Sequence, residues 1–153
     1  MILTKQHVIL MAEDDADDRL LVKEALAECK LEDCIRFVAD GVELMDYLLW
    51  RGKYLTPEAA PRPTFILLDL NMPRKDGREA LREIRAHPDL RRLPVVVFTT
   101  SNAKTDVEMV YDLGANSFVV KPVAFDALVK IVGQLAQYWF GIVEHPSPRL
   151  QFS

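Results

Sequence analysis

Short hydrophobic runs recur along the chain, and segments with helical periodicity separate them. The runs near 7–12, 65–68, 95–98 and 118–121 are nearly continuous, which is typical of strands buried on both faces of a parallel sheet. The run 34–38 instead alternates polar and apolar residues, as a half-buried edge strand does. The intervening pattern predicts helices at 16–28, 42–50, 77–87, 104–113 and 125–140.

This alternation of strands and helices predicts an α/β fold with three layers, α/β/α. Parallel strands joined by right-handed helical crossovers form a doubly wound sheet, and for five strands the flavodoxin-like order 2-1-3-4-5 is the natural candidate. Residues 52–63 interrupt the rhythm, because their prolines make this segment a loop. We expect one domain at 1–143, then a short irregular tail at 144–153 and no output domain.

Charged side chains stand directly after three of the predicted strands. Glu13 and Asp14 follow the first strand, Asp69 follows the third, and Lys121 ends the fifth. In doubly wound sheets ligands bind outside the carboxyl ends of the strands, so these groups should converge. Carboxylates that lie together repel one another unless they are protonated or bridged by a cation, and oxygen ligands favour Mg²⁺. The pattern therefore predicts a magnesium-dependent phosphate site.

Composition narrows the classes of protein. Half of the 153 residues are hydrophobic and 27% are charged, as in soluble globular domains. The net charge of −4, without a basic stretch, argues against binding of nucleic acid. No apolar run approaches the roughly 20 residues of a membrane span. The N-terminus lacks a signal-peptide pattern, so we expect no membrane partner and a cytoplasmic location. There, Cys29 and Cys34 are expected to be reduced thiols.

Several motifs, in the expected order, resemble the receiver domains of two-component response regulators over nearly the whole chain. They are the acid pair Glu13-Asp14, the Leu-Leu-Asp-Leu-Asn-Met-Pro run around Asp69, Asp76-Gly77, Thr99 after the fourth strand, and Lys121-Pro122. Each motif is weak alone, but each stands at the strand end where the family has it. The resemblance implies a binding module that is controlled by phosphorylation, not an enzyme, with self-dephosphorylation as an added activity.

The resemblance implies roles for the charged residues. Asp69 is the phosphoacceptor, because a carboxylate can attack a phosphoryl group and hold it as an aspartyl-phosphate. Asp14, Asp69 and the backbone carbonyl of Asn71 bind Mg²⁺, for which Mn²⁺ or Ca²⁺ can substitute in crystals. Glu13 acts on the ion through water, since Mg²⁺ keeps several of its waters. Lys121 holds the phosphoryl oxygens as a point charge.

The resemblance also implies a two-state switch. The Thr99 hydroxyl moves toward a phosphoryl oxygen, and the Phe118 ring fills the vacated space. Plain core packing is the alternative for Phe118. Thr100 stands where many receivers have alanine, and there it contacts and crowds the phosphate entrance.

Turn residues shape the neighbouring loops. Pro73 and Gly77 mark the turn before the third helix. The bond between Lys121 and Pro122 is often cis in the family, and we expect a cis bond here to aim the lysine side chain.

The remaining acids after the first strand are interpreted as solvated residues that start a helix: Asp15, Asp17 and Asp18.

Finer details are similar to the single-domain regulators paired with bacterial phytochrome histidine kinases. They are the segments 60–63, 75–79 and 138–140. The implied partner is a sensor histidine kinase, in particular a phytochrome, and output passes through another protein. The aromatics at 138–140 cannot all face one core, since successive helical residues point about 100° apart. This favours a homodimer through the last two helices and strand five, with a self-packed tail as the alternative.

Other functions remain open on the residues alone. Phosphatases of the haloacid dehalogenase type also use a strand-end aspartate with Mg²⁺, but they carry a second aspartate where this chain has Asn71. A flavodoxin would need serine, threonine and glycine in the loop where this chain has Glu13-Asp14-Asp15. A degenerate receiver that acts only as a scaffold is the third alternative.

Overall fold

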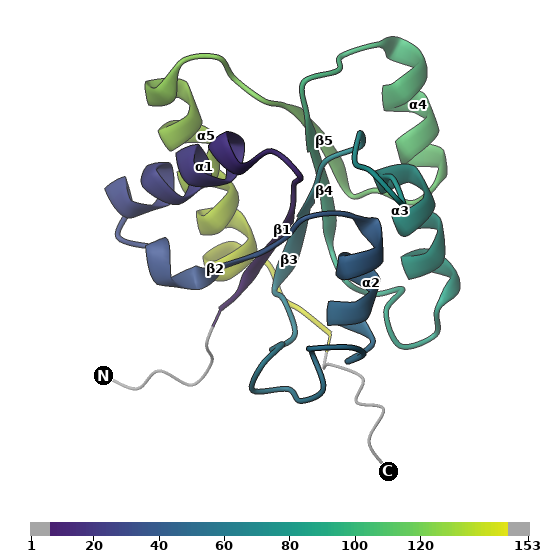
Figure 1. Cartoon of the computed structure of the whole chain (residues 1–153). Helices are drawn as coiled ribbons and strands as arrows, with labels where there is room; N and C mark the ends of the chain where they lie inside the picture. The colour runs from purple at the N-terminus through teal and green to yellow at the C-terminus, as the bar shows by residue number, and fades with distance from the viewer. Residues whose placement is uncertain (1–6, 147–153) are drawn as a thin grey trace.

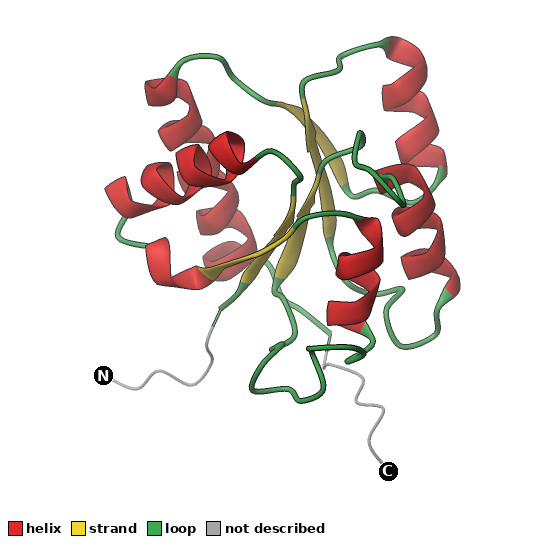
Figure 2. Ribbon diagram, in the orientation of Figure 1, coloured by secondary structure: helices red, strands yellow, loops and turns green. Residues whose placement is uncertain are grey.

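The computed structural model describes residues 7–146 as alternating strands and helices (Figures 1 and 2). The strands are β1 (Ile9–Ala12), β2 (Ile35–Val38), β3 (Phe65–Leu68), β4 (Val95–Thr99) and β5 (Ser117–Val120). The α-helices are α1 (Ala16–Glu28), α2 (Gly41–Leu48), α3 (Gly77–Ala86), α4 (Lys104–Asp112) and α5 (Phe125–Gln137). A 3₁₀ turn, η1 (Glu32–Cys34), precedes β2, and a π-helical turn, η2 (Tyr138–Ile142), follows α5.

The five strands form one parallel sheet in the order β2-β1-β3-β4-β5, which confirms the predicted fold class. Helices α1 and α5 pack together on one face, and α2, α3 and α4 cover the other face (Figure 1). β2 lies at an edge, as its alternating pattern predicted. All strands point the same way, so the loops that follow them meet at one end of the sheet.

The sheet divides the core into two hydrophobic clusters. Side chains of β1 and β3 alternate between the faces, so Leu10 and Ile66 join the cluster under α2 and α3, whereas Ile9 and Phe65 join the one under α1 and α5. Both faces of these strands are fully buried. This explains why the runs contain no polar residue.

Aspartates begin the three helices that follow β1, β2 and β3. Asp15 accepts hydrogen bonds from the backbone of Asp17 and Asp18, and thereby caps α1 as predicted. Asp40 caps α2 and Asp76 caps α3 in the same way. The loops after β1 and β2 are therefore at most three residues long, whereas the loop between β3 and α3 has eight residues.

The side chains of the three aromatic residues at 138–140 point in different directions, as the helical geometry requires. Tyr138 is 47% exposed, whereas Trp139 and Phe140 pack on the α1–α5 side of the core. The ring of Phe65 lies 6.1 Å from that of Trp139 and 5.8 Å from that of Phe140. Trp139 and Phe140 therefore pack against their own chain, as in the self-packed tail, whereas Tyr138 is exposed. The regular α-helix ends at Gln137, three residues earlier than predicted, where the π-helical turn begins.

Several smaller expectations are corrected or lie outside the described residues. The helical periodicity of 16–28 puts Leu21 on one apolar face with Val22, Ala25 and Leu26, but Leu21 is 43% exposed and the other three are buried. Cys29 and Cys34 are free thiols, as predicted. Of the predicted tail, residues 147–153 lie outside the described part. Within 7–146, no helix is long and apolar enough to cross a membrane.

Phe65→Ala should lower the free energy of unfolding by about 3–5 kcal/mol, because its fully buried ring supports the two C-terminal aromatics. Urea unfolding followed by circular dichroism measures this change. Leu55→Ala is the control, since Leu55 is 69% exposed and its loss should cost no more than about 0.5 kcal/mol. Equal effects of the two substitutions would contradict this account of the core.

Candidate metal and phosphoryl site

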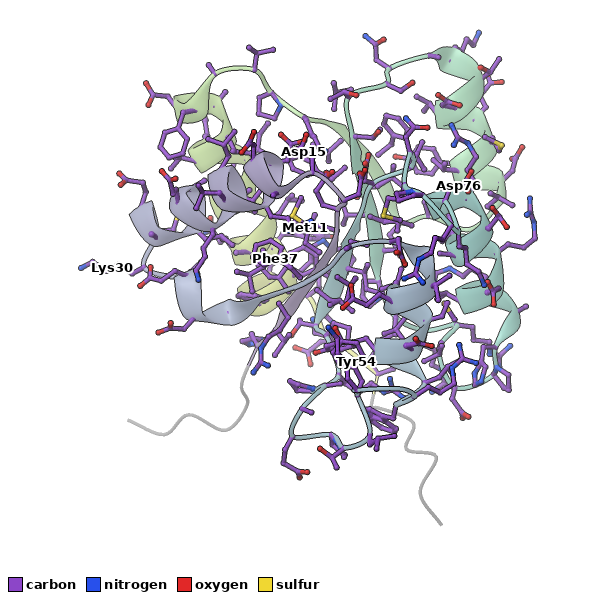
Figure 3. All side chains as sticks on the ribbon, in the orientation of Figure 1. Met11, Asp15, Lys30, Phe37, Tyr54 and Asp76 are labelled. Atoms are coloured by element: carbon purple, nitrogen blue, oxygen red, sulfur yellow. The ribbon has the colours of Figure 1, made fainter. Side chains whose placement is uncertain are left out.

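The strand-end acids gather at the carboxyl edge of the sheet. Glu13 and Asp14 follow β1, and Asp69 follows β3, its direct neighbour in the sheet. Each offers a carboxylate oxygen, and these oxygens all lie within 4.8 Å of one another. Figure 3 labels Asp15 and Asp76 near this end of the sheet and Tyr54 at the opposite end. The predicted convergence of the acids is therefore observed.

Burial sets the electrostatics of the acids. Glu13 is 1% exposed and Asp69 is 7% exposed, whereas Asp14 faces solvent. Burial raises the pKa of Glu13 to about 7, although a hydrogen bond from Lys121 opposes the shift. Burial also raises the pKa of Asp69, against the opposing charge of Lys121. Uncompensated negative charge is therefore costly here.

The donor set fits a divalent cation. Only oxygen ligands meet at the cluster, which suits hard cations such as Mg²⁺ or Mn²⁺. The exposed Asp14 leaves one side of the cluster open to solvent, so a bound ion can keep waters or take a ligand oxygen.

Lys121 supplies the positive charge at this edge. Its ammonium forms an ion pair with Glu13, lies 3.1 Å from Asp18 Oδ2 and lies 4.0 Å from Asp69 Oδ1. Burial alone would lower the pKa of Lys121, but the hydrogen bond to Glu13 and the charge of Asp69 raise it. The Lys121–Pro122 bond is trans, so the expectation of a cis bond is wrong for this structure. The ammonium reaches the acids without it.

Thr99 places an unpaired hydroxyl beside the cluster. Its side chain is fully buried at the end of β4, and within residues 7–146 Oγ1 has no hydrogen-bond partner of normal geometry. The hydroxyl is near enough to Asp69 to lower the pKa of that carboxyl. A buried polar atom without a partner is costly, and a phosphoryl oxygen on Asp69 would be a suitable acceptor. Thr100 is exposed, and its predicted phosphate contact stays a prediction.

Phe118 lies on β5, and β4 separates this strand from β3, which leads to Asp69. It is half-buried and packs against the cluster under α2 and α3. Its backbone N–H donates to the Tyr111 hydroxyl of α4 at 3.2 Å. This contact with α4 suits either the switch or plain packing, so the switch stays a prediction.

The loop between β3 and α3 has the predicted turn. Asn71 and Pro73 are exposed, and the Gly77 N–H donates to Leu70 O at 2.9 Å. A Cβ atom at Gly77 would lie 2.2 Å from Asp69 O, which is too close for any side chain. Glycine is therefore required where the loop returns to the phosphoacceptor candidate.

Two contacts of the site were missed in the sequence. Asp18, interpreted as a solvated acid, pairs with Lys121, and Arg19 Nη1 donates to Glu13 O at 2.6 Å. Asp18 stands four residues after Asp14, about one helical turn, so it points back toward the same edge. This spacing was the available signal. Pairing with Lys121 could not be inferred, because it depends on a strand about a hundred residues away.

Comparisons with known proteins agree with this geometry. The family model of the response regulator receiver domain matches residues 9–133. Response regulator Rcp1 of Synechocystis is 41% identical over 92% of this chain and 93% of its own length. A phosphorylated cyanobacterial phytochrome response regulator, RcpA, superposes with a TM-score of 0.85 at 40% identity, covering 94% of this chain and all of RcpA. The Mn²⁺-bound form of Rcp1 gives 0.79 at 41% identity, covering 92% of this chain and 99% of Rcp1.

Asp14→Ala should weaken Mn²⁺ binding at least about tenfold, because it removes the exposed carboxylate of the cluster. Isothermal titration calorimetry of the full chain measures the affinity. Asp17→Ala removes the same charge three residues later, in the first turn of α1, and should bind Mn²⁺ as the parent chain does. If both variants bound equally well, the cation would not sit at this cluster.

Proposed function

This chain belongs to the response regulator receiver family, and we propose that it accepts a phosphoryl group on Asp69 and signals by protein–protein interaction. The observation that carries the proposal is the buried Asp69 carboxylate, flanked by an acid pair and by the Lys121 ammonium. A buried carboxylate at a strand end is held in place to act as a nucleophile, and the nearby ammonium can take up the charge of the incoming group.

The proposed transfer needs little from the protein beyond position and charge. An Asp69 oxygen forms a bond to phosphorus while the phosphorus–nitrogen bond of a kinase phosphohistidine breaks, and the electron pair returns to the imidazole ring. Lys121 turns from Glu13 toward the phosphoryl oxygens, and the Thr99 hydroxyl donates to one of them. Asp14, Asp69 and the Asn71 carbonyl would hold Mg²⁺, which would neutralise charge on the transferring group. Later attack of water on the phosphorus breaks the bond to the Asp69 oxygen, releases inorganic phosphate and restores the carboxylate.

The modified state is proposed to differ at β4 and β5. Movement of Thr99 toward the phosphoryl group would open space at the end of β4, and the half-buried Phe118 ring on β5 is placed to fill it. The difference between the states would appear on α4, because Phe118 contacts Tyr111 there. A downstream protein that prefers one arrangement would shift the equilibrium toward it.

The phosphoryl donor is proposed to be a sensor histidine kinase, and specifically a bacterial phytochrome. Relatives that cover more than nine tenths of this chain support this: RcpA is a cyanobacterial phytochrome response regulator, and RPA3017 of R. palustris acts in red light signaling. RPA3017 is 33% identical with a TM-score of 0.86, covering 92% of this chain and 99% of RPA3017. We place this exchange in the cytoplasm, where both cysteines would stay reduced.

Two observations disfavour the phosphatase alternative. Asn71, two residues after Asp69, has no carboxyl to protonate a leaving group. The loop at 52–63 lies at the opposite end of the sheet, where Figure 3 labels Tyr54, so it cannot cover the acids as a cap.

Incubation with acetyl phosphate and Mg²⁺ should add one phosphoryl group to the chain, because a small donor bypasses the need for a kinase. Intact-protein mass spectrometry measures the adduct, which EDTA should prevent. Asp69→Asn should abolish it, and Asp76→Asn is the matched control, since asparagine still caps α3. An adduct that persists in Asp69→Asn, or none on the parent chain when another receiver reacts, would refute the proposal.

A homodimer is proposed through α4, β5 and α5. β5 is the free edge of the sheet beside β4. The exposed apolar side chains that surround it are Tyr111 on α4, Val120 on β5, Val123 in the following loop and Phe125 on α5. An apolar surface at a sheet edge is a typical protein-binding surface, and a second copy of the chain presents the same surface.

Val123→Glu should reduce dimerisation, because Val123 is fully exposed and a buried, unpaired charge is costly. Sedimentation velocity at tens of micromolar protein, with and without beryllofluoride as phosphoryl mimic, measures the association. Leu55→Glu adds the same charge at the far end of the sheet and should leave dimers intact. A parent chain that stays monomeric with the mimic would rule out this dimer.

A further inference from the structure

The loop between Asp69 and α3 has a constrained backbone at its tip. Arg74 has a φ of +65°, a region that side chains other than glycine rarely occupy. The N–H of Lys75 donates to Pro73 O at 2.7 Å, so the chain reverses within three residues. Such a conformation persists only where surrounding contacts hold it.

Those contacts come from the first turn of α2. Asp40 is 5% exposed, and its Oδ2 accepts from Arg74 Nε at 2.8 Å and lies 2.7 Å from Arg74 Nη2. The other oxygen, Oδ1, accepts from the Glu43 N–H and caps the helix. These hydrogen bonds and the Arg74 charge lower the pKa of Asp40, although burial acts in the opposite direction. One carboxylate therefore joins the start of α2 to the loop tip.

A second bond joins the same two elements. The Gly41 N–H donates to Lys75 O at 2.9 Å, and a Cβ at Gly41 would lie 2.3 Å from that oxygen. At its base the loop is closed by the bond from Gly77 to Leu70. The segment 71–76, which begins with Asn71, is therefore held at both ends.

We propose that Asp40 and Arg74 are positioning residues for the cation site. They hold the loop so that the Asn71 backbone stays beside Asp14 and Asp69, and they touch neither the ion nor the phosphoryl group. The inference rests on the proposed function, because it assigns to Asn71 the carbonyl ligand of the ion. Partners that orient metal ligands from outside typically change metal affinity 10- to 100-fold when they are removed.

This role can be separated from a purely structural one. The Arg74 side chain is 61% exposed, and an ion pair with such an exposed partner adds little to global stability. A positioning role predicts a large loss of metal affinity with a small change in melting temperature. A structural role predicts the reverse.

Calorimetric titration of the full chain with Mn²⁺ tests the inference. Arg74→Ala and Asp40→Asn should each weaken binding about tenfold, with Asp40→Asn still able to cap α2. The double variant should be no weaker than either single one, because both break the same contact. Arg51→Ala is the matched control: it removes a similarly exposed arginine, 56% against 61%, from an ion pair with Asp46, and should leave affinity unchanged.

The outcomes separate two failures. If the parent chain binds no Mn²⁺, the cation site and the proposed function fail together. If both single variants bind Mn²⁺ as tightly as the parent chain does, the positioning role is wrong. It is also wrong if the losses of affinity in the two single variants add up in the double variant. If Asp40→Asn lowers the melting temperature strongly, Arg74→Ala alone decides, since it leaves the helix cap intact.

Discussion

Repulsion among carboxylates at the carboxyl edge of the sheet determines how the charged groups around them are arranged. Parallel strands bring Glu13, Asp14 and Asp69 together, and burial makes the negative charge of Glu13 and Asp69 costly. The chain offsets this charge with the Lys121 ammonium, and the geometry leaves room for a divalent cation as a second source of compensation. Under the proposed function, a phosphoryl group on Asp69 would add further negative charge here and would draw Lys121 away from Glu13.

Backbone and side-chain contacts connect the acidic edge to β4, β5 and α4. The Lys121 N–H donates to Thr99 O at 2.8 Å, so the ends of β4 and β5 are joined beside the acids. Thr99 is buried with an unpaired hydroxyl, and Phe118 connects β5 to α4 through Tyr111. These contacts form the route by which the proposed switch would carry a change at Asp69 to the face around α4.

The fold and the convergence of the acids were predictable because both follow from local pattern and from the geometry of parallel sheets. Continuous apolar runs marked strands such as Phe65–Leu68, and the residues that follow strands necessarily meet at one edge. The Lys121–Asp18 and Asp40–Arg74 pairs could not be predicted, because each joins elements that are distant in sequence. The π-helical end of α5 was also missed, since it depends on Trp139 and Phe140 packing against Phe65.

The most direct test is a crystal structure with Mn²⁺ and beryllofluoride, in which anomalous scattering locates the metal without reference to the protein. We expect one metal peak bounded by Asp14, Asp69 and the Asn71 carbonyl, with beryllium on Asp69 and Lys121 moved from Glu13 to a fluorine. A metal peak elsewhere, or a Lys121–Glu13 pair that persists beside a modified Asp69, would contradict this expectation.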